Sequence, residues 1–309
     1  GRVRLEGRTL PVTKRTNVDP HVRHAQVRFH LVAMDLRGHG ASGKPEDSAA
    51  YTDTALWSGD ISGVIAAAEL TRPTVVGWSY GARVIAAHLA QAGDAHLGGV
   101  VLAGGILAIG AAREDWMVGP SSPGLDRDLY TDDLPRRLSA TARFVAACTA
   151  RPLDRTTYAE TVGANMLCPA HVRRALFAAD LDLRPAYAAL RRPGLVVHGL
   201  ADRVVTPATG EATAALMPKG RFLGYEGVGH APFLEAPDRL DELGCEIDFE
   251  GFDCAQARPV VLFCNGLWCG QSPSAIRRMI AAGYPADRIF YYRGGMQSWR
   301  MLGLSVTGE

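Results

Sequence analysis

The sequence predicts an α/β fold in which a mostly parallel β-sheet is covered by flanking helices. Short apolar runs alternate with longer Ala- and Leu-rich amphipathic stretches, a pattern typical of strands that alternate with helices. The short runs are apolar throughout, as expected for parallel strands that are buried on both faces. The 309 residues are enough for one large domain or two smaller ones.

Five apolar runs are predicted to be strands. They read FHLVAMDL (29–36), TVVGW (74–78), GGVVLAGG (98–105), PGLVVHG (193–199) and PVVLFC (259–264). Between them, DISGVIAAAEL (60–70) and ARVIAAHLAQAG (82–93) are predicted to be helices. Residues of about 112–190 interrupt the alternation with helical, Pro-broken sequence, which predicts a helical cap over one end of the sheet.

The composition changes after residue 244, and this change predicts a division into domains. The stretch 245–257 contains Gly, Pro and acidic residues without a clear period, so we interpret it as a linker. We expect residues 1–244 to form the main domain. Residues 258–309 are predicted to form a small α/β segment, with a helix at SPSAIRRMIAAG and a strand at RIFYY.

Charge and cysteine usage exclude several classes of function. Lys and Arg number 33 against 32 Asp and Glu, so we expect neither a nucleic-acid partner nor an anionic membrane surface. No apolar run reaches the ~20 residues of a membrane-spanning helix, and the first residues lack the apolar core of a secretory signal. The six cysteines do not resemble a disulfide framework, so we expect a cytoplasmic location. No phosphate-binding glycine loop or complete metal-ligand set is present, and no cofactor or metal is predicted.

The strongest motif is GWSYG, in which Ser79 stands between Gly77 and Gly81. It fits G-x-S-x-G at a sharp strand-to-helix turn, where small neighbours give clearance and the serine hydroxyl is exposed. The N–H of Tyr80 would then point at a developing oxyanion. We interpret Ser79 as a nucleophile, and the alternative is a polar residue at an ordinary turn.

A serine nucleophile needs a base, and the base needs an acid to orient it. His230, in EGVGHAPFLEAP, lies in a Gly-rich loop after the strand-like piece RFLGYEG. Asp202, in VVHGLADRVVTP, lies just after another predicted strand. His39 and His198 are interpreted mainly as structural, although His198 is near Asp202, where a packing or supporting role is expected. Asp35 is not favoured as the acid.

These motifs carry a resemblance to a known family. DLRGHGASGKP, VVGWSYGARV, VVHGLADRVVTP and YEGVGHAPFLEAP resemble the α/β-hydrolase family over residues of about 29–243, and most closely its small capped esterases and haloperoxidase-like hydrolases. The resemblance implies Ser79 as nucleophile, His230 as general base and Asp202 as the residue that fixes the tautomer of the base. It also implies a cap that lines an acyl pocket and a small-molecule acyl substrate, such as a carboxylic ester.

The front of the chain departs from the family pattern. Only 28 residues precede FHLVAMDL, where the family has three strands and a His-Gly loop that supplies a second oxyanion donor. The sequence therefore predicts either a fold that lacks its first strands or a different loop in their place. The large apolar residues of the insertion either line the pocket or pack in the core; they are Trp116, Met117, Phe144, Met166 and Phe177.

The segment from about 258 to 305 resembles the carboxyl-terminal half of a rhodanese-like sulfurtransferase domain. The resemblance implies Cys264 as a sulfur-carrying residue at the end of a strand. Cys264 and Cys269 are alternatively buried thiols, a redox pair or two ligands of an incomplete metal site. The sequence thus favours a serine hydrolase, with a sulfurtransferase that uses Cys264, or a weakly active or inactive truncated fusion, as the alternatives.

Overall fold

The computed structural model describes residues 2–5, 8–11, 32–236, 260–263 and 289–292. The chain divides into two compact units. One unit is formed by residues 2–13 and 34–237. The other is formed by residues 1, 14–33 and 238–309.

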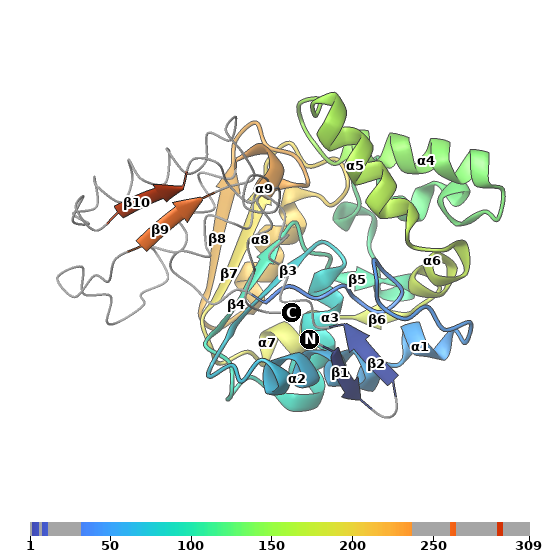
Figure 1. The fold of residues 1–309 in the computed structure, drawn as a ribbon. Helices are drawn as coiled ribbons and strands as arrows, with labels where there is room; N and C mark the ends of the chain where they lie inside the picture. The colour runs from blue at the N-terminus through green and yellow to red at the C-terminus, as the bar shows by residue number, and fades with distance from the viewer. Residues whose placement is uncertain (1, 6–7, 12–31, 237–259, 264–288, 293–309) are drawn as a thin grey trace. The chain divides into compact units, whose positions relative to one another are not determined.

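The first unit contains a sheet of four parallel strands in the order β3-β4-β7-β8. The strands are β3 (Thr74–Trp78), β4 (Gly99–Ala103), β7 (Gly194–Gly199) and β8 (Gly220–Tyr225), and Figure 1 shows them side by side. Every residue of β4 and β7 is buried, which agrees with their uninterrupted apolar sequence. The predicted parallel sheet with flanking helices is confirmed.

Helices alternate with these strands along the chain. They are α1 (Ala49–Thr52), α2 (Thr54–Ala67), α3 (Gly81–Ala92), α7 (Arg184–Ala188) and α8 (Pro207–Leu216). The carboxylate of Asp53 accepts the Ala55 N–H and so caps α2, which begins six residues before the predicted helix. Helix α3 packs on α2 and β3, and α8 packs on β7 and β8. The core between them includes Trp57, Leu102 and Tyr187, all fully buried.

The predicted strand at 29–36 is wrong over its described part, residues 32–36, which form no strand. A strand needs a hydrogen-bonded neighbour, and loop contacts engage this segment instead. Asp35 accepts the Ala41 N–H at 2.8 Å through its carboxylate and the Ser42 hydroxyl at 2.6 Å through its carbonyl. Residues 29–31 lie outside the described residues.

An antiparallel hairpin of β1 (Arg2–Leu5) and β2 (Arg8–Pro11) precedes this segment and was not predicted from the sequence. The prediction that the fold lacks its first strands concerns the 28 residues before FHLVAMDL, of which 1, 6–7 and 12–28 lie outside the described residues.

The interruption at about 112–190 is helical, as predicted. It contains α4 (Leu134–Ala147), α5 (Arg155–Met166) and α6 (Ala170–Phe177), which lie together in Figure 1. Short 3-10 helices precede them, at Gly110–Ala112, Asp115–Met117, Pro123–Leu125 and Arg127–Tyr130. A two-residue ladder joins β5 (Ala108–Ile109) to β6 (Leu181–Asp182), so both ends of the insertion are held together.

In the second unit, β9 (Val260–Phe263) and β10 (Ile289–Tyr292) pair in parallel. Both strands lie where the apolar runs PVVLFC and RIFYY predicted them. The predicted linker at 245–257, the predicted helix at SPSAIRRMIAAG, and Cys264 and Cys269 lie outside the described residues.

Candidate active site

Ser79 lies in the turn that joins β3 to α3. Its φ is +50°, a left-handed conformation that a residue with a side chain rarely adopts. The Ser79 N–H donates to the Ala103 carbonyl of β4 at 2.9 Å, which anchors the turn. A Cβ atom at Gly77 would lie 2.9 Å from the backbone of Gly81, so the close approach of β3 and α3 requires glycine there.

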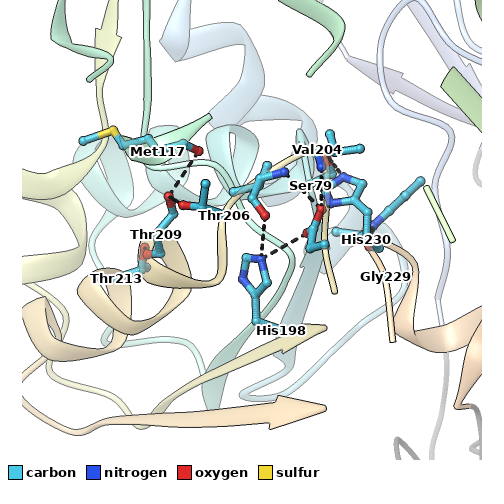
Figure 2. Close-up of polar contacts among 12 residues, drawn as sticks. Ser79, Met117, His198, Val204, Thr206, Thr209, Thr213, Gly229 and His230 are labelled. Carbon is cyan, nitrogen blue, oxygen red and sulfur yellow. Dashed lines mark hydrogen bonds and ion pairs between the residues drawn. The ribbon is translucent and has the colours of Figure 1, made fainter. Parts of the chain in front are cut away.

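The structure brings Ser79, His230 and Asp202 into one chain of hydrogen-bonding contacts, and Figure 2 shows Ser79 beside His230. Ser79 Oγ lies 2.8 Å from His230 Nε2, and His230 Nδ1 lies 2.8 Å from Asp202 Oδ2. The imidazole and the carboxylate are fully buried. The structure thus brings together three residues that are far apart in sequence.

The backbone around His230 is held on two sides. His230 lies in the loop between β8 and α9 (Pro232–Glu235). Its carbonyl accepts the indole N–H of Trp78 at 2.7 Å. The preceding Gly229 N–H donates to the Glu235 carboxylate at 2.6 Å, and the other oxygen of Glu235 accepts the Ala150 N–H at 2.9 Å. These contacts fix the imidazole next to Ser79.

Four donors surround the Asp202 carboxylate. Oδ1 accepts the backbone N–H groups of Val204 and Val205 at 2.7 and 3.0 Å. Oδ2 is shared by His230 and by His198 Nε2, which lies 3.0 Å away. Burial by itself would raise the pKa of Asp202, but the hydrogen bonds from His198 and His230 outweigh it and hold the pKa well below its usual value. Asp202 is therefore ionised at neutral pH.

Tyr80 begins the turn of α3 that follows Ser79. The first N–H groups of a helix have no intrahelical acceptor and lie at the positive end of its dipole. The Tyr80 N–H lies at this end of α3, and its role as an oxyanion donor stays a prediction. The segment in which a second donor was sought lies largely outside the described residues.

A pocket opens at Ser79 and is mostly apolar. Its lining consists of Ser79, Tyr80, Ile106, Leu107, Ala108, Ile109, Arg113, Met117, Val118, Ser122, Pro123, Phe177, Val204 and Val205. Of the large apolar residues of the insertion, Met117 and Phe177 line the pocket, whereas Trp116, Phe144 and Met166 do not. For Met117 and Phe177 this is the first of the two predicted alternatives. Phe144 packs instead against the buried cluster of Cys148, Val204 and Val205.

The pocket wall at Met117 is tied to α8 by threonines (Figure 2). Thr209 Oγ1 donates to the Met117 carbonyl at 3.2 Å, and Thr213 Oγ1 donates to the Thr209 carbonyl at 2.7 Å. Thr206 Oγ1 donates to the Trp116 carbonyl at 2.6 Å. Helix α8 therefore positions one side of the pocket. These threonines carry no sequence motif, and the sequence analysis missed them.

Other candidate residues take structural places. His39 lies in a turn, with Nδ1 3.1 Å from the Arg37 carbonyl, and burial lowers its pKa. Arg37 forms its ion pair with Asp60 at 2.7 Å. The described cysteines, Cys148 and Cys168, are free, buried thiols.

Among the residues that the structure describes, no group of three metal-ligating side chains could hold an ion, and no helix is long and apolar enough to cross a membrane.

Comparison with known proteins decides the family. A sequence model described as the Alpha/beta hydrolase family matches residues 14–243. The chain belongs to the alpha/beta hydrolase family. The prediction of an esterase-like α/β-hydrolase enzyme is confirmed, and the match begins earlier than the predicted residue 29.

Several curated and solved relatives of this α/β-hydrolase are named as esterases. The chain is 32% identical over 235 residues to a pimeloyl-[acyl-carrier protein] methyl ester esterase from Xanthomonas oryzae pv. oryzae, covering 72% of this chain and 86% of the relative. The corresponding esterase from Nitrosomonas europaea is 30% identical over 231 residues, with the same coverage. The crystal structure of esterase RhEst1 from Rhodococcus sp. ECU1013 is 32% identical, with a TM-score of 0.70, and the similarity covers 76% of this chain and 86% of that chain.

Proposed function

We propose that this α/β-hydrolase is a serine esterase that cleaves carboxylic esters through an acyl-enzyme. The observation that supports the proposal is the continuous contact chain from Ser79 Oγ through His230 to Asp202, with 2.8 Å at each step. An ionised Asp202 accepts the Nδ1–H of His230, so His230 Nε2 has a free lone pair that accepts the Ser79 hydroxyl proton.

In the first half-reaction, Ser79 Oγ attacks the ester carbonyl while His230 takes the hydroxyl proton. The negative charge on the carbonyl oxygen develops next to the Tyr80 N–H at the start of α3. His230 then gives the proton to the leaving alcohol, and the ester C–O bond breaks. The acyl group is now bound to Ser79.

In the second half-reaction, His230 takes a proton from water, and the resulting hydroxide oxygen attacks the acyl carbonyl. The carboxylic acid leaves, and Ser79 Oγ regains its proton from His230. Throughout, Asp202 orients the imidazole and stabilises its protonated form without taking the proton.

The substrate class follows from the pocket. Leu107, Ile109 and Met117 line the space that begins at Ser79, so we infer an apolar acyl chain there. Two relatives are named as methyl ester esterases whose substrate is a pimeloyl group on an acyl carrier protein. A methyl ester of a medium-length acyl chain, free or carried by such a protein, is the substrate that we propose for this chain.

A series of p-nitrophenyl esters from acetate to laurate tests this proposal. We expect kcat/KM to rise with chain length up to a medium chain, because each added methylene is buried in the pocket and contributes up to about 0.8 kcal/mol. Ser79→Ala should abolish the reaction with every ester. Equal rates for acetate and octanoate, or hydrolysis that survives Ser79→Ala, would contradict the proposal.

The sulfurtransferase alternative stays a prediction. Cys264 directly follows β9, and the parallel pairing of β9 with β10 is compatible with a small α/β segment. Cys264 itself and the residues that follow it up to 288 lie outside the described residues. The hydrolase is therefore the function that we put forward.

A further inference from the structure

His198 on β7 makes a contact that the proposed mechanism does not use. Its side chain, labelled in Figure 2, is fully buried, and Nε2 lies 3.0 Å from Asp202 Oδ2 and 3.1 Å from the Val205 carbonyl. An ionised carboxylate and a carbonyl are both acceptors only. His198 Nε2 must therefore carry a proton and share it between the two oxygens.

The other ring nitrogen of His198, Nδ1, is buried and has no hydrogen-bond partner among the described residues. A Cβ atom at Gly210 would lie 2.5 Å from Nδ1, so α8 packs closely against this side of the ring. A proton on Nδ1 would be buried and unpaired, which is costly. The geometry thus favours the tautomer with the proton on Nε2.

Asp202 Oδ2 consequently has two imidazole donors that compete for one oxygen. The first is His230 at 2.8 Å, and the second is His198 at 3.0 Å. The carboxylate itself is held by its other oxygen, through the N–H groups of Val204 and Val205. Loss of the His198 donor would therefore leave the carboxylate in place and give Oδ2 to His230 alone.

We propose that His198 is a positioning residue that sets the basicity of His230 through the shared oxygen Asp202 Oδ2. Because the His198 N–H also binds this oxygen, less of the oxygen's negative charge is available to stabilise protonated His230. The base His230 therefore stays unprotonated at lower pH. The proposal rests on the proposed function for its effect on catalysis. The coupling between the two histidines does not depend on it.

Other titratable groups near this pair do not take the place of His198. The Cys148 thiol faces Asp202 from the end of α4, and burial raises its pKa to about 12, so it is uncharged. Glu235 of α9 binds the Gly229 N–H next to His230 and does not contact Asp202. On the α8 side, the ring of His198 meets Gly210, which has no side chain.

The test compares His198→Phe, which removes the donor and keeps a flat ring, with His198→Gln, which keeps an N–H donor. The exposed His96, whose contact is with His88, supplies the matched control His96→Gln. NMR titration of the His230 ring in the substrate-free protein gives its pKa directly. The pH profile of kcat/KM for a neutral ester gives the catalytic effect.

We expect His198→Phe to raise the pKa of His230 by about one unit, a tenfold change in proton affinity. The acid limb of the pH profile of kcat/KM should shift to higher pH by the same amount. KM should be unchanged, and kcat on the alkaline plateau should stay within about fivefold of the parent. His198→Gln should lie close to the parent, and His96→Gln should equal it. An unchanged or lower pKa of His230 in a folded His198→Phe variant would overturn the proposal.

The parent protein provides a second measurement that does not depend on the folding of a variant. The ¹⁵N shifts of His198 should report the tautomer with the proton on Nε2 at the pH of the activity assay. A proton on Nδ1 instead would overturn the proposal. If the parent hydrolyses no ester while the titration shows the coupling, the proposed function fails and the inference about His198 stands.

Discussion

At the scale of single residues, the backbone of Ser79 is strained. A non-glycine residue with φ near +50° costs of order 1–3 kcal/mol and persists only where its surroundings fix it. Here the bond from the Ser79 N–H to Ala103 and the packing of α3 on β3 fix it. The strain raises the hydroxyl above the carboxyl end of the strand, where it meets His230.

The Asp202 carboxylate also makes stability depend on pH. Its pKa lies below the ordinary value of 3.8 in the folded protein, chiefly because the donors around it outweigh the effect of burial. The unfolded chain therefore takes up the proton first as the pH falls. The stability that Asp202 contributes is fully present above that ordinary value and is lost as the pH falls towards the lower folded pKa.

We predict that the gap in unfolding free energy between the parent and Asp202→Asn narrows as the pH falls from 6 to 3, because only the parent contains this titrating group. Urea unfolding at a series of pH values measures the gap. Asp128→Asn serves as control, because its exposed ion pair with Arg136 contributes little. A gap that is constant over this range would show that Asp202 has an ordinary pKa in the folded protein.

The predicted candidate residues share a simple property. Ser79 directly follows β3, and Asp202 and His230 lie in the loops that follow β7 and β8. Parallel strands end at the same edge of a sheet, so the sequence could place these loops near one another. His198 was expected only to pack or support, since its contact depends on how the loop of residues 199–205 folds back on β7. Its spacing of four residues from Asp202 was the available signal.

At the scale of elements, the turn from β3 to α3 depends on one of its two glycines more than on the other. A Cβ atom at Gly77 would lie 2.7 Å from Ile85 Cδ1 and 2.9 Å from the carbonyl of Gly81. A Cβ atom at Gly81 would have no atom within 4 Å outside its immediate neighbours. The G-x-S-x-G pattern treats the two glycines alike, whereas the structure does not.

We predict that Gly77→Ala destabilises the protein by about 1–3 kcal/mol, because α3 must move away from β3. The displaced turn should also lower kcat. Gly81→Ala is the matched control and should stay within about 1 kcal/mol of the parent, since alanine suits the first turn of a helix. Thermal unfolding and ester hydrolysis measure both variants. Equal effects at the two positions would contradict this description of the turn.

Elements were predictable where sequence and neighbours agree. The runs at β4 and β7 are apolar throughout, and both strands are buried between two parallel partners. The apolar run at 32–36 has the same appearance, but Asp35 binds the following turn and no strand forms. The hairpin of β1 and β2 has polar, Arg-rich sequence that does not match the apolar pattern used to find strands. Strand pairing is a property of neighbours, which a local pattern does not contain.

At the scale of the whole molecule, the chain extends beyond its family match. The match covers residues 14–243. Residues 238–309 belong to a different compact unit from the one that contains Ser79, Asp202 and His230. The pocket and the contact chain are built from that one unit. Ester hydrolysis should therefore not require the chemistry of Cys264.

We predict that Cys264→Ser leaves kcat/KM for ester hydrolysis within twofold of the parent. Sulfur transfer from thiosulfate to cyanide, measured on the parent and on Ser79→Ala, tests the sulfurtransferase alternative separately. Sulfur transfer that survives Ser79→Ala and disappears in Cys264→Ser would establish a second activity. Loss of ester hydrolysis in a folded Cys264→Ser variant would contradict the independence of the two segments.

The central claim is that His230 and Asp202 activate Ser79, and labelling with a fluorophosphonate probe tests it most directly, because such probes react with activated serines. The parent, Ser79→Ala and His230→Ala are labelled in parallel, with circular dichroism to show that each is folded. We predict rapid labelling of the parent at Ser79, none in Ser79→Ala, and a rate at least about 10³-fold lower in His230→Ala. A folded parent that does not label, or that labels equally without His230, would contradict the account.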